Sequence, residues 1–203
     1  MRPKNPEKTT LFPIFLKLAG RNCVVVGGGR IGAQKVAALL DAGARVTVVD
    51  PSPADEVRDL KSSGAIRWEE RTYVSSDLDG AYLVIAATSK PELNWQVVRD
   101  AHARGALVNV VDVPELCDFY YPAVVRRGPL AIAISSQGKS PLLAQRLRDE
   151  ISGQLSESIG AAAVRIGAER LRILRTHPAG EKREQLLRDL VYPSGRIEGS
   201  HDV

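Results

Sequence analysis

The sequence has 203 residues, of which 44% are hydrophobic and 26% charged, a composition typical of a soluble globular protein with one domain and a smaller appendage. Its net charge of +4 is too small to indicate a nucleic-acid-binding protein, and its two cysteines imply no disulfide framework. No apolar stretch approaches the roughly 18 residues of a membrane span, and residues 1–10 lack the apolar core of a secretory signal. We therefore expect a cytoplasmic protein that binds neither nucleic acid nor a membrane.

Apolar strands alternate with amphipathic helices between residues 21 and 112. Helical spacing of apolar residues predicts a helix over 31–42, and Pro91 and Gly105 bound a second helix. The strands that we expect cover residues 22–26, 45–49, 66–68, 82–87 and 107–111, the third being the weakest. Strands this apolar, separated by helices, predict an α/β fold with a Rossmann-type parallel sheet covered on both faces.

The pattern changes after Asp112. Two short apolar segments flank the turn-forming residues 126–129 and predict a β-hairpin, and Ser140 followed by Pro141 is typical of a helix start. An Arg-rich helical stretch follows. We therefore expect four parts, which are a Rossmann domain over 1–112, a small hairpin region over 113–150, a helical C-terminal domain over 151–192 and a disordered tail over 193–203.

A glycine-rich turn follows the first expected strand, with the sequence Gly27-Gly28-Gly29-Arg30-Ile31-Gly32. The pattern G-x-G-x-x-G is weak by itself, but here it lies between a strand and a helix, as a dinucleotide-binding turn requires. Gly27 permits the tight turn, Gly29 lets the backbone approach a pyrophosphate, and Gly32 lets the helix pack close to the sheet. The alternative is a glycine turn with no ligand.

Asp50 ends the second expected strand, where an acidic residue accepts hydrogen bonds from the adenine-ribose hydroxyls in this fold. A carboxylate there repels a 2′-phosphate, so the sequence favours NAD over NADP. Thr88 follows the fourth strand, whose carboxyl end lines the cofactor crevice. It either contacts the ribose and nicotinamide side of the cofactor or is an ordinary residue of the strand-to-loop connection.

Asp112 lies just beyond the fifth strand, where ligands of open α/β sheets bind. It either accepts a proton as a general base or caps the turn at Val113-Pro114. The polar loop 135–141, which includes Ser136 and Lys139, either binds carboxylates or is a plain connection with good capping. The His and Cys residues have no metal-ligand spacing, so we expect no resident metal.

These features, together with Leu11-Phe-Pro-Ile-Phe-Leu16, Ala86-Ala87-Thr88, Asn109-Val-Val-Asp112 and Ser135-Ser-Gln-Gly-Lys-Ser-Pro141, occur in an order that resembles a known family. The chain looks like precorrin-2 dehydrogenase, the N-terminal module of bifunctional siroheme synthases. The resemblance spans residues 11–190. It implies oxidation of precorrin-2, a reduced tetrapyrrole with eight carboxylates, to sirohydrochlorin with NAD as cofactor, in siroheme or cobalamin biosynthesis.

The resemblance also implies roles for individual residues. The NAD contacts of the family match Arg30 and Ile31 after the glycines, and Pro51 and Ser52 after the second strand. Its essential aspartate, assigned to proton removal, matches Asp112. A serine that is phosphorylated in some members matches Ser136, which with Lys139 is our candidate for substrate binding.

Relatives form homodimers through the region after the Rossmann domain, and some also insert ferrous iron, so a ferrous or cobalt ion is a candidate second substrate. The methyltransferase module of some relatives is absent from this sequence, and Gln137 and Lys139 stand where some relatives have smaller residues. Two alternatives remain open from the residues. One is a metal chelatase with secondary NAD chemistry, and the other is a nucleotide-sensing regulatory module without catalysis.

Overall fold

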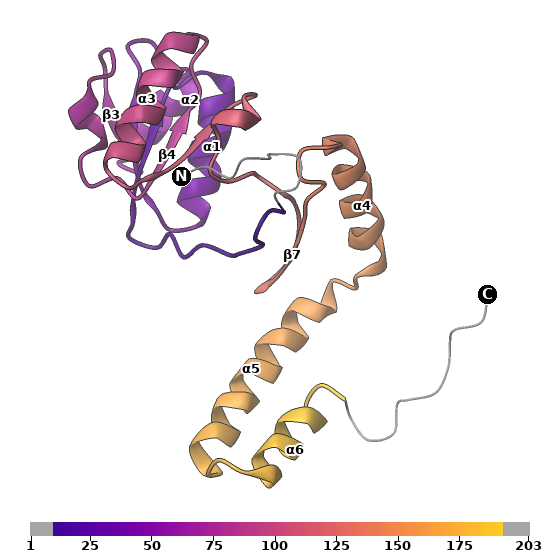
Figure 1. Cartoon of the computed structure of the whole chain (residues 1–203). Helices are drawn as coiled ribbons and strands as arrows, with labels where there is room; N and C mark the ends of the chain where they lie inside the picture. Colours follow the sequence, from indigo (N-terminus) through magenta and orange to yellow (C-terminus); the bar gives the residue numbers. More distant parts are fainter. Residues whose placement is uncertain (1–9, 193–203) are drawn as a thin grey trace. The chain divides into compact units, whose positions relative to one another are not determined.

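The apolar segments between residues 22 and 110 form a five-stranded parallel sheet (Figure 1). The structure, a computed structural model, describes residues 10–192, which divide into two units between Tyr121 and Pro122. The sheet belongs to the first unit, and its strands lie in the order β3-β2-β1-β4-β5. Their bounds are β1 (Asn22–Val26), β2 (Arg45–Val49), β3 (Arg67–Glu69), β4 (Leu83–Ala86) and β5 (Leu107–Val110).

The strand order reverses between β1 and β4, because the chain runs outward from β1 to β3 and then returns to the other side of β1. Val26 is in register with Val49 on one side and with Ala86 on the other, and Ala86 is in register with Val110. The carboxyl ends of these four strands are therefore level. In open α/β sheets, ligands bind at such an edge, beside the point where the strand order reverses.

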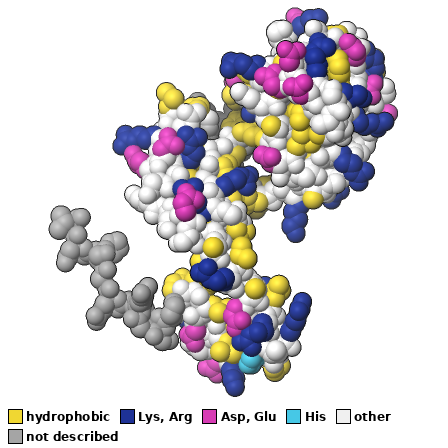
Figure 2. Space-filling model, turned by 180° about the vertical axis from the view of Figure 1, so that it is seen from behind, with side chains coloured by type: hydrophobic (Ala, Val, Ile, Leu, Met, Phe, Trp, Pro, Cys, Tyr) yellow, Lys and Arg dark blue, Asp and Glu magenta, His cyan; other side chains and the backbone are white. Residues whose placement is uncertain are grey.

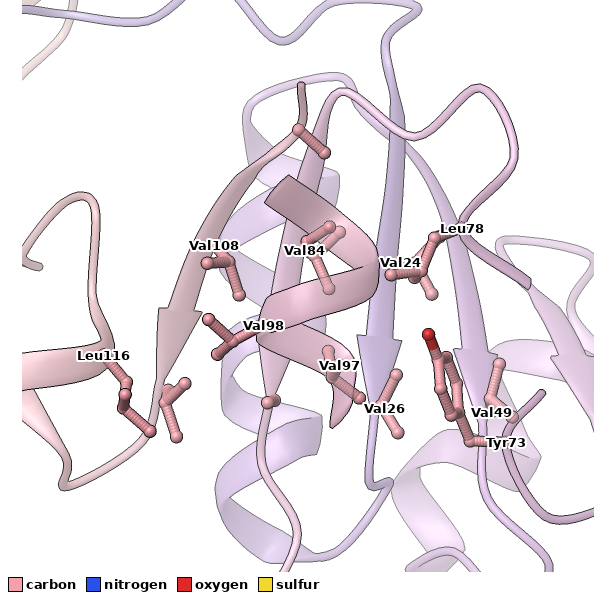
Figure 3. Close-up of a cluster of buried hydrophobic side chains, with 14 residues drawn as sticks. Val24, Val26, Val49, Tyr73, Leu78, Val84, Val97, Val98, Val108 and Leu116 are labelled. Carbon is pink, nitrogen blue, oxygen red and sulfur yellow. The ribbon is translucent and has the colours of Figure 1, made fainter. Parts of the chain in front are cut away.

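Three helices cover the two faces of the sheet, namely α1 (Arg30–Asp41), α2 (Asp55–Ser62) and α3 (Pro91–Ala103). Val36 and Leu39 of α1 and Val57 of α2 belong to the core cluster of one face. The cluster of the other face contains residues of α3, which lies across the strands in Figure 3. There Val97 and Val98 of α3 lie over side chains of the strands and of their neighbouring loops, including Val24, Val26, Val84, Val108, Tyr73 and Leu78. Two short 3₁₀ turns, η2 (Ser75–Leu78) and η3 (Pro114–Leu116), complete this unit.

The second unit consists of an antiparallel hairpin and three helices. The hairpin pairs β6 (Ala123–Arg127) with β7 (Leu130–Ile134), and the helices are α4 (Pro141–Gln154), α5 (Ser158–Thr176) and α6 (Glu181–Asp189). The Arg127 guanidinium fixes the hairpin to α4, because its Nη2 donates to the carbonyl of Ser152 at 2.9 Å and to the Ser152 hydroxyl at 3.0 Å. A Cβ on Gly160 would lie 2.7 Å from the carbonyl oxygen of Arg127, so glycine is needed where α5 meets the hairpin.

Apolar side chains also lie on the surface of this second unit (Figure 2). Leu142 of α4 exposes 77% of its area in the single chain, and Val164 of α5 exposes 60%. Among residues 10–192, no helix combines the length and apolar character that crossing a bilayer requires.

The predicted fold class is confirmed in its parallel sheet, its hairpin and its C-terminal helices. The predicted helix over 31–42 is observed as α1, one residue earlier at each end, and the weak strand expected at 66–68 is β3. The tail predicted over 193–203 lies outside the described residues.

We expect that Ile85→Ala lowers the free energy of unfolding by about 2–5 kcal/mol, because Ile85 in β4 is fully buried and its truncation leaves a cavity. The control is Val74→Ala, which truncates a side chain that is 45% exposed and should cost less than about 1 kcal/mol. Urea unfolding followed by circular dichroism measures both. Equal losses would contradict the buried position of Ile85.

Candidate functional site

At two of the glycines around the turn after β1, a backbone atom of another residue occupies the place where a side chain would begin. Gly27 has a φ of +99°, and a Cβ on it would lie 2.5 Å from the carbonyl oxygen of Ala87. A Cβ on Gly32, in the first turn of α1, would lie 2.1 Å from the carbonyl oxygen of Gly27. The helix therefore begins in direct contact with the turn, as the sequence pattern predicts.

The start of α1 is open at the middle glycine of the motif. Gly29 is the N-cap of α1 without a side-chain cap, and apart from its two chain neighbours no described residue has an atom within 4 Å of the place where its Cβ would be. The first N–H groups of a helix have no partner inside it, and they carry partial positive charge. Arg30 and Ile31 supply such N–H groups, and the turn thus fits the pyrophosphate of a dinucleotide.

The carboxylate of Asp50 braces this turn against the loop that follows β2. Its Oδ2 accepts a hydrogen bond from the N–H of Gly28 at 2.6 Å, and its Oδ1 accepts one from the N–H of Ser52 at 2.7 Å. The indole N–H of Trp68 donates to the Asp50 carbonyl oxygen at 2.8 Å. Each carboxylate oxygen still has a free lone pair, so Asp50 remains able to accept from ribose hydroxyls, and Pro51 and Ser52 are exposed beside it.

The Thr88 hydroxyl forms hydrogen bonds with residues at the start of α3. Its hydroxyl lies 2.7 Å from Oδ1 of the buried Asn94 and accepts from the N–H of Lys90 at 3.2 Å, while the Asn94 amide donates to the Thr88 carbonyl. Of the two roles that the sequence leaves open for Thr88, these bonds favour the structural one. The single hydroxyl proton serves the helix start, which leaves one lone pair for a ligand.

Asp112 follows β5 and, unlike Asp50, presents a carboxylate that has no partner among residues 10–192. Its backbone has a φ of +60°, a left-handed conformation that Asp tolerates better than most residues. Its side chain is exposed and takes part in none of the hydrogen bonds or ion pairs within residues 10–192. The 3₁₀ turn that begins at Pro114 has no side-chain cap, so the alternative in which Asp112 caps that turn is not what the structure has.

Lys35, which the sequence did not single out, lies near Asp112 and contacts the ring of Tyr121. Lys35 of α1 holds its ammonium 3.8 Å from the ring centroid of Tyr121, which ends the first unit. Partial burial lowers the pKa of Lys35, and the nearby Asp112 carboxylate acts in the opposite direction. Burial raises the pKa of Tyr121 to about 12, so its hydroxyl is neutral at ordinary pH. The only local signal for Lys35 is its place one helical turn after Ile31.

Ser136 and Lys139 belong to the loop between β7 and α4 in the second unit. The Ser136 hydroxyl accepts from the N–H of Ser140 at 2.9 Å, and Ser140 in turn caps α4 by accepting from the N–H of Leu143. Gln137 has a φ of +54°, which with the glycine after it makes a tight turn. Lys139 is exposed. The loop is therefore held by its own serines, with the Lys139 side chain available to a ligand.

Within residues 10–192, no three His, Cys, Asp or Glu side chains gather into a metal-binding group. The Cys117 thiol lies 3.2 Å from the Val110 carbonyl, and burial raises its pKa. Asp118 accepts from the N–H of Val108 at 2.9 Å and pairs with His102 at 3.0 Å. Both residues are thus engaged in holding the segment after β5.

Comparisons with known proteins agree with this fold. Residues 14–123 match the family described as putative NAD(P)-binding, and residues 127–154 match the central part of sirohaem biosynthesis proteins. The siroheme synthase of Methylobacillus flagellatus is 42% identical over 179 residues, which cover 88% of this chain and 38% of the relative. The siroheme synthase of Thioalkalivibrio sulfidiphilus is 39% identical over 199 residues, which cover 95% of this chain and 41% of the relative. The chain thus spans about two fifths of the length of these relatives.

A solved structure of SirC, precorrin-2 dehydrogenase, superposes with a TM-score of 0.77 at 28% identity and covers 89% of each chain. The family that the sequence resembles and the nicotinamide type of cofactor that it predicts are confirmed by these matches. The assignment of single residues to NAD or substrate remains a prediction.

We expect Gly29→Ala to weaken NAD binding about tenfold, roughly the effect of losing one hydrogen bond, because the methyl group enters the space of the pyrophosphate. Its stability should stay unchanged, since φ and ψ of Gly29 are open to alanine. Gly32→Ala is the matched comparison and should destabilise the fold by about 1–3 kcal/mol or more through overpacking. Titration with NAD and thermal unfolding separate the two effects. Unaltered NAD affinity in Gly29→Ala would show that the pyrophosphate does not bind at this turn.

Proposed function

We propose that this chain, which belongs to the putative NAD(P)-binding family through residues 14–123, is an NAD-dependent dehydrogenase that oxidises precorrin-2 to sirohydrochlorin. The observation that carries the proposal is the exposed carboxylate of Asp112 after β5, which has no partner in the described part of the chain. The chain resembles SirC, precorrin-2 dehydrogenase, over 89% of its length. A dehydrogenation needs a proton acceptor as well as a hydride acceptor, and a carboxylate outside the sheet edge supplies the first.

When bound, NAD supplies the hydride acceptor. The N–H groups at the start of α1, including those of Arg30 and Ile31, bind its pyrophosphate. Asp50 accepts hydrogen bonds from the adenine ribose, beside Pro51 and Ser52. The same carboxylate disfavours a 2′-phosphate, which is why we propose NAD rather than NADP.

The oxidation removes one hydride and one proton from neighbouring atoms of the reduced tetrapyrrole. One C–H bond breaks and its electron pair leaves with the hydride, the neighbouring proton passes to the Asp112 carboxylate, and the remaining pair forms the new double bond. Asp112 later releases the proton to water, so the products are sirohydrochlorin, NADH and one proton. The chain's main task is to hold two planar groups face to face, since orientation supplies up to about 7–11 kcal/mol of the barrier.

The proposal extends to a homodimer, in which the hairpin region over 113–150 serves dimerisation and substrate binding. It is supported by exposed apolar side chains of this region, such as Leu142 and Leu143, which a second copy would cover. Residues 1–112 hold the cofactor in this scheme, and Ser136 and Lys139 contact the substrate. A cytoplasmic location is part of the proposal, in keeping with the free thiols of both cysteines.

The test of the proposed function is incubation of the purified chain with precorrin-2 and NAD. We expect the absorption spectrum of sirohydrochlorin to appear together with one equivalent of NADH. A parallel incubation of sirohydrochlorin with ferrous or cobalt ion and no NAD tests metal insertion. Absence of NADH in the first incubation would overturn the proposal and leave the alternative of a nucleotide-sensing module.

Asp112→Ala should lower turnover by roughly 10²–10⁴-fold, the contribution of a general base, and keep its affinity for NAD. Glu115→Ala is the control, because it removes an exposed carboxylate three residues away. Steady-state production of NADH and titration with NAD give both quantities. Wild-type turnover in Asp112→Ala would refute the role of Asp112.

Asp50→Asn should lower the preference for NAD over NADP, measured as the ratio of the two kcat/KM values, by about tenfold. The reason is that one negative charge near the 2′-phosphate is worth about 1–4 kcal/mol of repulsion at an exposed site. Asp55→Asn in α2 is the matched control, since its side chain is 97% exposed. A ratio that stays at the wild-type value in Asp50→Asn would place the adenine ribose elsewhere.

A further inference from the structure

The ammonium of Lys35 is a cation that lies on an aromatic ring and has no ion pair with any described residue. Its Nζ lies 3.8 Å from the ring centroid of Tyr121, and the side chain is half-buried. Within residues 10–192, no carboxylate oxygen lies within the 4.0 Å of an ion pair with it. The groups that act on it are the Tyr121 ring, whose hydroxyl stays neutral, and the Asp112 carboxylate. Three N–H donors are thus held at the edge of the site with spare capacity.

The position of Tyr121 follows from a buried polar residue of β5. Asn109 is 7% exposed, and its amide donates to the carbonyl oxygen of Phe119 at 2.8 Å. Phe119 packs against the core on the α1 face of the sheet, and its ring lies 5.8 Å from that of Tyr121 at 58°. The segment after β5 is therefore turned so that the Tyr121 ring meets α1, which fixes where the Lys35 ammonium lies.

Lys35 also lies close to the part of α1 that binds the cofactor. Ile31 and Lys35 are separated by one helical turn, so their side chains are neighbours on one face of the helix, about 5–6 Å apart at Cβ. The charge of the Asp112 carboxylate also acts on Lys35, so the cation lies near Asp112 as well as one turn along α1 from Ile31. A substrate held beside Asp112 is then within reach of this cation.

We propose that Lys35 is a substrate-binding residue, which takes one carboxylate of the polycarboxylate substrate and so holds the reacting ring beside Asp112. This inference rests on the proposed function, since that function supplies a substrate with several carboxylates. A cation that is already partly desolvated and held on an aromatic face loses little further hydration or side-chain freedom when a carboxylate binds.

The experiment compares Lys35→Met with Lys35→Arg in the full chain. Met keeps the length and apolar stem of the side chain over Tyr121 but removes the charge. We expect KM for precorrin-2 to rise about tenfold or more in Lys35→Met, the effect of losing one charge-assisted hydrogen bond, with NAD affinity within twofold of wild type. Lys35→Arg should recover most of the lost affinity. Lys61→Met, which removes an exposed lysine of α2, controls for the change in net charge.

A second measurement does not depend on turnover. Sirohydrochlorin, which keeps the carboxylates of the substrate, is titrated into each variant at low and high salt. At low salt, the wild type should bind sirohydrochlorin at least about tenfold more tightly than Lys35→Met does. The difference should shrink at high salt, because added ions screen the attraction between Lys35 and the carboxylate. Unfolding midpoints show that each variant is folded.

The outcomes separate the two proposals. A wild type that yields no NADH overturns the proposed function, and the titration still decides on Lys35. Equal affinity for sirohydrochlorin in wild type and Lys35→Met overturns the inference and leaves Lys35 as a residue that packs on Tyr121. A loss confined to kcat, with KM and affinity unchanged, overturns it as well, because Lys35 would then act on Asp112 and not on the substrate.

Discussion

The contact between helix α1 and the turn after β1 sets the position of the groups around the proposed site. Gly27 and Gly32 meet there without room for a side chain, and this lets α1 begin directly above the carboxyl edge of the sheet. One face of the helix then places Val36 and Leu39 in the core, while another brings Lys35 to the Tyr121 ring. A larger residue at the contact would move the helix start, the cation and the core face together, so packing and ligand binding depend on the same two glycines.

Two carboxylates at this edge differ in how far the fold satisfies them. Asp50 accepts backbone hydrogen bonds with both oxygens and therefore stabilises the turn before any ligand is present. Asp112 has a left-handed backbone conformation, and its carboxylate has no partner among the described residues. Asp50 is thus part of the folded turn itself, whereas the carboxylate of Asp112 is left open to a ligand.

The features that sequence patterns predicted well are those set by neighbours in the chain. Apolar strands, the glycine turn and the Ser140 cap of α4 depend on short-range geometry, and each is found within one or two residues of its expected position. The bracing by Asp50 is only partly local, since one of its bonds reaches back to Gly28 across α1 and β2. The sequence could not predict the pairing of Thr88 with Asn94 either. A threonine after a strand looks the same in the sequence whether it contacts a ligand or caps the next helix. Sequence patterns could not identify Lys35. Its environment is made by Tyr121, which follows the last strand of the sheet and is therefore far from Lys35 in the sequence.

Asn109 shows how one buried polar residue of a strand determines a contact between residues that are distant in the sequence. In a strand whose neighbours are apolar, an amide side chain costs about 1–3 kcal/mol unless it is hydrogen-bonded. Its amide nitrogen donates to the Phe119 carbonyl and to the Cys117 sulfur, and the bond to Phe119 also fixes the path of the segment that carries Tyr121. An apolar side chain at this position would pack in the sheet as well but would give that segment no fixed partner. The polar residue is thus explained by the position it imposes on the Tyr121 ring, and through that ring on the Lys35 ammonium beside Asp112.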